Sequence, residues 1–277
     1  DPMYESKSGY DIFTLIAEKF GVADKFTEGR TLEEWTRHLH EQNQEAIEDL
    51  PDFEEFRENG VHRYYNPDGL TVSLREFRED PEKNPLTTPS GKIEVYSDRL
   101  AAMSKKWTFD DFRPELPGDK LTPLPEHVDT WEGTMEARGN DAYPLQVIGH
   151  HFKGRTHSTY GNVDWLKAAH RQTVWMNSID ADARGIGNGD EVFVYNERGT
   201  IRLEAKVTER IMPGVVSVPQ GAWFDPQPAS EVGAPAKANS KHMVDVGGSV
   251  NTLTSLHPSP LAKGNAVHTT IAEIAKA

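Results

Sequence analysis

Cysteine is absent from the 277-residue sequence. Without thiolates the chain can form neither a disulfide nor a cysteine-ligated zinc or iron–sulphur centre. It also lacks an apolar run long enough to span a bilayer, so direct membrane insertion is not expected. The first residue is Asp1 rather than Met, and no basic start or apolar stretch typical of a signal peptide follows it. We therefore expect this end to arise from processing or truncation.

Positive charge is scarce in one half of the chain only. The net charge is -14, and residues 1–141 carry 17 Lys and Arg against 32 Asp and Glu, whereas residues 142–277 carry 13 against 12. Like-charge repulsion therefore disfavours a nucleic-acid partner. The second half is close to neutral, so a local basic cluster within it can hold a small anion.

The first half has the pattern of helices joined by polar loops. Apolar residues at helical spacing predict a helix over residues 10–20. Thr31 and Glu34 have the spacing of a capping box and predict the start of a second helix. A turn rich in Pro and Gly is followed by a predicted short strand over residues 93–95.

The second half has the pattern of short strands. Alternating apolar residues predict a β-hairpin over residues 192–207, with its turn at 196–199. One short helix is predicted over residues 179–184, and further strands around Val147, Val174, Val216 and Ile271. Short strands at this density are typical of a small closed barrel. The predicted class is α+β, with a helical and loop-rich segment over residues 1–141 and a barrel domain over residues 142–277.

A loop that directly follows the first predicted strand has the strongest chemical signal. No acidic residue occurs over residues 142–163, which include three histidines, one Lys, one Arg and several hydroxyls. Gly149 and Gly154 let backbone N–H groups approach a ligand closely. Lys153 and Arg155 can donate charge-assisted hydrogen bonds to phosphate oxygens. The loop is therefore a candidate anion site, and a solvated loop whose histidines cap strand ends is the alternative interpretation.

A zinc site is a further alternative, because three histidines in eight residues could act as ligands. However, His150 and His151 are adjacent and would point to opposite sides of an extended chain, and no carboxylate is near to support them. Metal binding is therefore disfavoured. Outside the loop, Trp223 could stack on a ligand and Asn251 could bind a base edge, or both could be structural.

Five ordered motifs resemble those of a known family: TPSGKIEVYS (88–97), GHHFKGRTHSTYGNVDW (149–165), RIMPGVV (210–216), NTLT (251–254) and PSPLAKGN (258–265). They are similar to motifs of the dimethyl sulfoxide reductase family of molybdopterin oxidoreductases. Within it, the resemblance is closest to the catalytic subunits of the anaerobic, membrane-associated reductases. It extends over residues 1–277 and is looser in the helical half.

The resemblance implies that residues 142–277 form a six-stranded double-psi β-barrel that binds molybdopterin dinucleotide, and that residues 1–141 are the end of the family's middle region with a linker. It implies a bis-(molybdopterin guanine dinucleotide) molybdenum cofactor in the intact enzyme, with no iron–sulphur cluster, catalytic residue or metal ligand in this part. The implied cofactor-binding residues are Gly149, His150, His151, Phe152, Lys153, Gly154, Arg155, Thr156, His157, Ser158, Trp223, Asn251 and His268.

The implied function is reduction of an S-oxide or N-oxide such as dimethyl sulfoxide in anaerobic respiration, with this part holding the cofactor and inactive alone. Implied partners are the remainder of the catalytic subunit, an iron–sulphur electron-transfer subunit and a membrane anchor subunit, on the periplasmic or the cytoplasmic side. Two alternatives stay open. One is a stand-alone barrel that acts as a binding or interaction module, and the other is a reductase of another oxyanion, such as nitrate or selenate.

The purified chain should contain no stoichiometric molybdenum, iron or zinc, because it lacks cysteine and its histidine cluster lacks carboxylate support. Elemental analysis of the purified protein measures this directly. One tightly held zinc ion per chain would overturn this interpretation of His150, His151 and His157.

Overall fold

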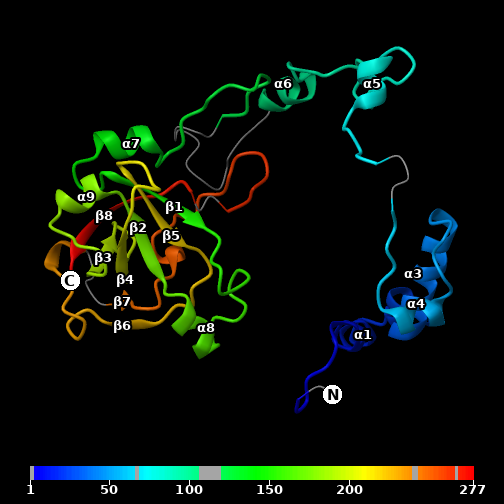
Figure 1. Ribbon diagram of the computed structural model, residues 1–277, viewed down its shortest axis with the longest axis horizontal. Helices are drawn as coiled ribbons and strands as arrows, with labels where there is room; N and C mark the ends of the chain where they lie inside the picture. The colour runs from blue at the N-terminus through cyan, green and yellow to red at the C-terminus, as the bar shows by residue number, and fades with distance from the viewer. Residues whose placement is uncertain (1–2, 66–68, 106–119, 239–242, 266–267) are drawn as a thin grey trace. The chain divides into compact units, whose positions relative to one another are not determined.

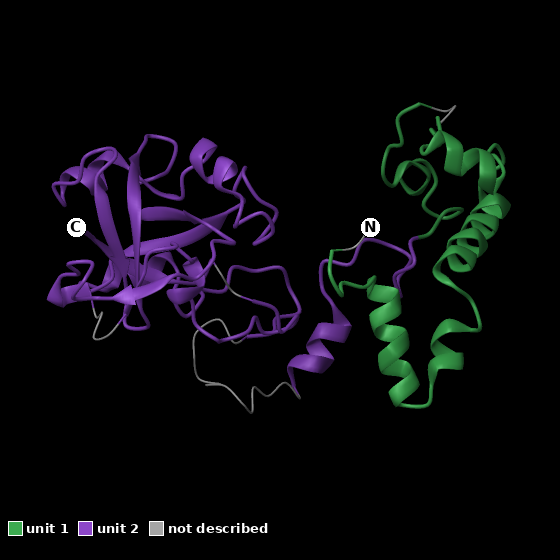
Figure 2. Ribbon diagram, turned by 90° about the horizontal axis from the view of Figure 1, so that it is seen from below, with its two compact units in different colours: residues 1–85 green, residues 86–277 purple. Residues whose placement is uncertain are grey.

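The computed structural model describes residues 3–65, 69–105, 120–238, 243–265 and 268–277. They form two compact units, Asp1–Pro85 and Leu86–Ala277 (Figure 2). The predicted boundary between residues 141 and 142 falls inside the second unit, shortly before its first strand, and stays a prediction. Within the described ranges no helix is both long and apolar enough to cross a membrane.

The first unit is built from short helices: α1 (Gly9–Lys19), α2 (Ala23–Thr27), α3 (Leu32–Ala46), α4 (Phe53–Asn59) and α5 (Arg75–Glu79). The helix predicted over residues 10–20 is α1. The predicted capping box is present at the start of α3, where the side chain of Thr31 accepts from the N–H of Glu34 and the Glu34 carboxylate accepts from the N–H of Thr31. Both predictions are confirmed.

Helices α6 (Asp98–Ser104) and α7 (Thr134–Gly139) precede the barrel in the second unit. The strand predicted over residues 93–95 is wrong, because these residues form no strand. Ile93 and Val95 are 65% and 64% exposed. A strand requires a partner for its backbone groups, and alternating apolar residues alone do not supply one.

Six strands close into a barrel, in the order β2 (Thr173–Met176), β5 (Val215–Pro219), β1 (Leu145–His150), β8 (Ile271–Lys276), β3 (Glu191–Tyr195) and β4 (Thr200–Val207). The parallel pairing of β4 with β2 completes the ring. Figure 1 shows this barrel with α7 and α9 (Ser178–Asp182) outside it. The predicted α+β class, the closed six-stranded barrel and the hairpin β3–β4 are confirmed.

Several elements around the barrel have no counterpart in the sequence predictions. A two-stranded ribbon of β7 (Met243–Asp245) and β6 (Pro226–Pro228) extends the sheet beyond β4, and α8 (Asp164–Ala169) lies between β1 and β2. Short 3-10 turns occur at Ala236–Ala238 and Val250–Thr252. These segments are short and rich in small or polar residues, so they carry little periodic signal.

The alternation of apolar residues along the strands gives the barrel its core. In β4, Ile201, Leu203 and Ala205 are buried, and the two residues between them are partly exposed. Side chains of all six strands meet inside, and the fully buried ones include Val147, Val174, Val194 and Val216. On the other face of β3, Phe193 packs in a second cluster with residues from the segments around β7. Hydrophobic burial therefore fixes the register of the strands.

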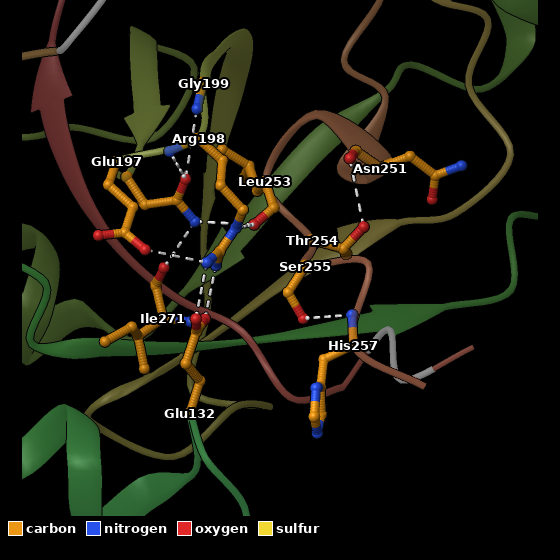
Figure 3. A network of polar contacts seen from close by, with 11 residues as sticks. Glu132, Glu197, Arg198, Gly199, Asn251, Leu253, Thr254, Ser255, His257 and Ile271 are labelled. Atoms are coloured by element: carbon orange, nitrogen blue, oxygen red, sulfur yellow. Dashed lines mark hydrogen bonds and ion pairs between the residues drawn. The ribbon is translucent and has the colours of Figure 1, made fainter. Parts of the chain in front are cut away.

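An ion pair connects the hairpin turn to the segment before α7. Both Nη atoms of Arg198 donate to the carboxylate of Glu132, at 2.7 and 2.6 Å, and its Nε donates to the carbonyl oxygen of Leu253 at 2.7 Å. The same carboxylate accepts from the N–H of Ile271 at 3.1 Å. Figure 3 shows the planar guanidinium between these groups. A bidentate pair with so many partners fixes four segments together.

Replacing Glu132 with Ala should lower the free energy of unfolding of the barrel by about 3 kcal/mol. The largely buried charge of Arg198 would then keep only the exposed Glu197, at 3.4 Å, as an ion partner among the described residues. The side chain of Arg198 is 22% exposed and that of Glu132 is 15% exposed. The double variant E132L/R198M should recover part of this loss. The control E33A removes a pair whose side chains are 61% and 63% exposed and should cost less than about 1 kcal/mol. Urea unfolding measures all three, and equal losses in E132A and E33A would contradict the assignment.

Candidate functional site

Two parallel strands end side by side at the candidate site. β1 and β5 run parallel, with His150 opposite Pro219, so the chain leaves both strands at the same end of the barrel. The first strand leads into the loop over residues 151–163 and the second into the turn at residues 220–221. The N–H of Gln220 donates to the carbonyl oxygen of His150 at 3.0 Å. The loop and the turn are therefore held next to one another.

The loop folds back on itself and contacts the turn by its backbone. Thr156 and Thr159 form a bridge, and His157 between them has a φ of 50°. At Gly221, where φ is 85°, a Cβ atom would lie only 1.8 Å from the carbonyl oxygen of His157. Only glycine permits both this dihedral angle and this approach. Gly149 and Gly154 were predicted from the sequence to allow close approach of a ligand, whereas Gly221 was not.

Arg155 is the cation that the loop positions most firmly. Its Nη2 donates to Oε1 of Gln172 at 2.6 Å and to the carbonyl oxygen of Gln220 at 3.1 Å. The guanidinium lies 4.1 Å from the ring centroid of Phe152. Its Nε is buried and finds no hydrogen-bond partner in the part of the chain that the structure describes. Burial lowers the pKa of the Arg155 guanidinium, but such groups start so far above neutrality that it stays charged.

Gln172 connects three segments of the site, and sequence reasoning missed it. Besides accepting from Arg155, its amide donates to the carbonyl oxygens of Pro219 at 2.7 Å and Gly248 at 3.0 Å. The loop after β1, the end of β5 and the turn before Val250–Thr252 are thereby held together. A single Gln before a strand carries no signal in the sequence, because its partners are 47 and 76 residues away.

The three loop histidines do not converge. Nδ1 of His150 lies 2.7 Å from Oγ of Ser217, whereas His151 is exposed and its ring centroid is 5.8 Å from that of His157. Among the described residues no group of three His, Asp or Glu side chains could hold a metal ion. His268, which is remote in sequence, accepts a hydrogen bond from the N–H of Gly149 at 3.1 Å. That N–H is therefore committed to His268 and not free for a ligand.

Several of the predicted residues line one cavity of about 450 Å³ at this end of the barrel, namely Phe152, Gly154, Arg155 and Trp223, together with Gln172. The indole Nε1 of Trp223 donates to the carbonyl oxygen of Ser158 at 2.7 Å, which fixes the ring against the loop. Lys153, His150 and His151 line a second cavity on the other side of Phe152.

Asn251 lies in the 3-10 turn Val250–Thr252 and is exposed. Its side chain points away from the Arg198 network in Figure 3, and it lines neither of the two cavities. Thr156 and His157 are exposed on the loop. A role for these residues in ligand binding stays a prediction.

The closed mixed barrel carries a glycine-containing cationic loop beside its parallel strands β1 and β5. This arrangement suits an anionic ligand. Residues 145–271 match the family described as "Molydopterin dinucleotide binding domain". The matched range contains β1 to β7 and the candidate site, and ends at the first residue of β8.

Several reductases match the chain over almost its whole length. It is 50% identical to dimethyl sulfoxide reductase DmsA of Escherichia coli (strain K12) over 99% of this chain and 31% of that protein. It is 36% identical to the dimethyl sulfoxide/trimethylamine N-oxide reductase of Cereibacter sphaeroides, over 100% and 32%. The chain therefore spans about a third of the length of these relatives. Over almost all of its length the chain is therefore similar to one part of these reductases.

A solved structure shares the fold at low sequence identity. Acetylene hydratase from Pelobacter acetylenicus superposes with a TM-score of 0.62 over 100% of this chain and 34% of that chain, at 17% identity. This likeness concerns the fold alone.

Substituting Gly221 with Ala should displace the loop, because the added Cβ would collide with the backbone of His157. Gly214 provides a matched control, since its φ of 81° is similar but a Cβ there would meet nothing within 4 Å. G214A should cost about 1–2 kcal/mol for the left-handed backbone alone. G221A should cost roughly a further 1–3 kcal/mol for overpacking. Urea unfolding compares the two, and equal costs would show that the contact with His157 is not a constraint.

Proposed function

We propose that this chain grips the organic part of a bis-(molybdopterin guanine dinucleotide) molybdenum cofactor in an oxidoreductase. The proposed reaction is reduction of an S-oxide or N-oxide, such as dimethyl sulfoxide, in anaerobic respiration. The molybdenum centre, when bound, would supply the oxygen-atom chemistry, and the residues of this chain would bind and orient its dinucleotide. The names of the relatives and the matched domain family support this proposal.

The observation that carries the proposal is the half-buried guanidinium of Arg155 beside a cavity, because its buried Nε has no hydrogen-bond partner among the described residues. A buried N–H without a partner costs about 1–3 kcal/mol, and an anion oxygen from a ligand would remove this cost. The walls of the cavity also suit such a ligand, because the aromatic rings of Phe152 and Trp223 can pack against a planar ring system. The residues present therefore suit an aromatic ligand that carries phosphate.

Three neighbouring residues would orient the loop that binds the cofactor without contacting the cofactor themselves. Gln172 holds Arg155 in place through Oε1, and Gly221 keeps the backbone of His157 close to the turn. His268 binds the N–H of Gly149 and so orients the start of the loop. Each acts on the loop and not on the reacting atoms.

Iron–sulphur clusters of the usual kind need cysteine, and this sequence has none, so the proposed electron supply would come from residues outside it. We propose that the remainder of the catalytic subunit, an iron–sulphur electron-transfer subunit and a membrane anchor subunit provide it. Attachment to the membrane, on the periplasmic or the cytoplasmic side, would then be through these partners.

In the full-length enzyme, Arg155→Ala should reduce cofactor content per folded protein by about tenfold or more, because a charge-assisted contact contributes about 1.5–3 kcal/mol. Lys153→Ala should have a smaller effect, since an exposed ammonium makes a more replaceable contact than a planar fork. Asn251→Ala should weaken retention with little salt dependence, through loss of a neutral hydrogen bond. Pterin fluorescence after oxidation, across a salt series, measures the content.

Arg138→Ala is the control, because this exposed arginine of α7 lies in the same unit and outside the lining of both cavities. Full retention by Arg155→Ala at every salt concentration would make the loop an ordinary surface turn and remove the assignment of the site.

A further inference from the structure

A second cavity, of about 490 Å³, lies on the outer face of the seam where β2 and β4 close the barrel. Trp175 of β2 is in register with Lys206 of β4, and the ammonium of Lys206 lies 4.2 Å from the indole centroid. His150 approaches the same indole, with ring centroids 5.0 Å apart. Barrel closure therefore builds one wall of this cavity.

The lining of this cavity is strongly cationic in a protein whose net charge is -14. It includes Lys153, Arg171, Lys206 and Arg210, and none of its lining residues is Asp or Glu. Arg171 is paired with Glu204 at 2.6 Å. The other three make no ion pair with any residue that the structure describes. Like charges gathered without counter-ions repel one another, and this cost is recovered when an anion binds.

The cavity also has features that suit an organic anion better than a single small ion. Its volume falls in the range of small-molecule sites, roughly 300–1,000 Å³. The apolar part of its lining includes Trp175, Phe152 and Pro219. His150 stays uncharged more readily than usual, because burial and then the charge of Lys206 lower its pKa. A neutral imidazole can hydrogen-bond a ligand without adding to the repulsion.

We propose that this cavity is an anion site that binds the phosphoryl oxygens of a phosphorylated small molecule, with Lys206 and Arg210 as its main charged contacts. Two sources share this chemistry. One is the diphosphate of the dinucleotide cofactor, in which case the site extends the proposed function and rests on it. The other is a separate phosphorylated compound that binds next to the cofactor.

The test uses inorganic pyrophosphate as the probe and the full-length protein, both cofactor-loaded and cofactor-free. Calorimetric titration of the cofactor-free protein should detect binding, and the double variant K206M/R210Q should weaken it by at least about tenfold, since each charge-assisted contact accounts for about that factor. The control K237M/R138Q makes the same change in charge at exposed positions outside the lining. It should bind like the unmodified protein.

The cofactor-loaded protein distinguishes the two sources. If pyrophosphate no longer binds and K206M/R210Q also lowers pterin content, the cofactor's own diphosphate occupies the site. If pyrophosphate binds equally well and pterin content is unchanged, the ligand is a separate compound. Pyrophosphate binding through Lys206 and Arg210 in a protein that never contains pterin would support the site and reject the proposed function. No binding, or equal binding by K206M/R210Q and the unmodified protein, would overturn the site itself.

Discussion

The parallel pairing of β2 with β4 is the contact on which the rest of the second unit depends, because it converts a sheet into a ring. β2 has only four residues and also pairs with β5, so it is held on both sides. The chain between β1 and β2 must then start and finish within the same end of a rigid barrel. Arg155 near its beginning and Gln172 near its end can therefore meet and hydrogen-bond. A site formed in this way is positioned by strands rather than by the loop alone.

Irregular segments around the barrel are held by buried polar groups and not by sheet hydrogen bonds. The carboxylate of Asp245 is almost inaccessible and accepts hydrogen bonds from the N–H groups of Asp225, Gly247 and Ser249 at 2.6–2.9 Å. Charge-assisted bonds of this kind satisfy backbone donors that a turn would otherwise leave buried and unbonded. Arg198 does the same for the carbonyl oxygen of Leu253. These side-chain hydrogen bonds thus hold the long turns in place where they leave the strands.

The sequence was sufficient for the features that depend on neighbouring residues, and insufficient for those that depend on distant ones. Alternation along β3 and β4, the turn between them and the capping box of α3 are local, and each was predicted. The loop after β1 was proposed as an anion site because it is basic and free of acids, and this role stays a prediction. Gln172 and Gly221 act through partners dozens of residues away, so no local pattern reveals them. The false strand over residues 93–95 has the same cause, since alternation does not provide a partner strand.

An acidic chain can bind anions only through fields of short range. At physiological ionic strength charges separated by more than about 8 Å are largely screened, so the charges next to a bound anion matter more than the net charge of the chain. What matters is how each cation is exposed. Arg155 is half-buried and fixed by its partners, so an interaction with it is weakly screened and specific in direction. Lys206 and Arg210 are exposed, so they attract anions over a wider approach but with more dependence on salt. Because Phe152 lines both cavities, a ligand that spans them would meet an attracting surface on one side and a directional contact on the other.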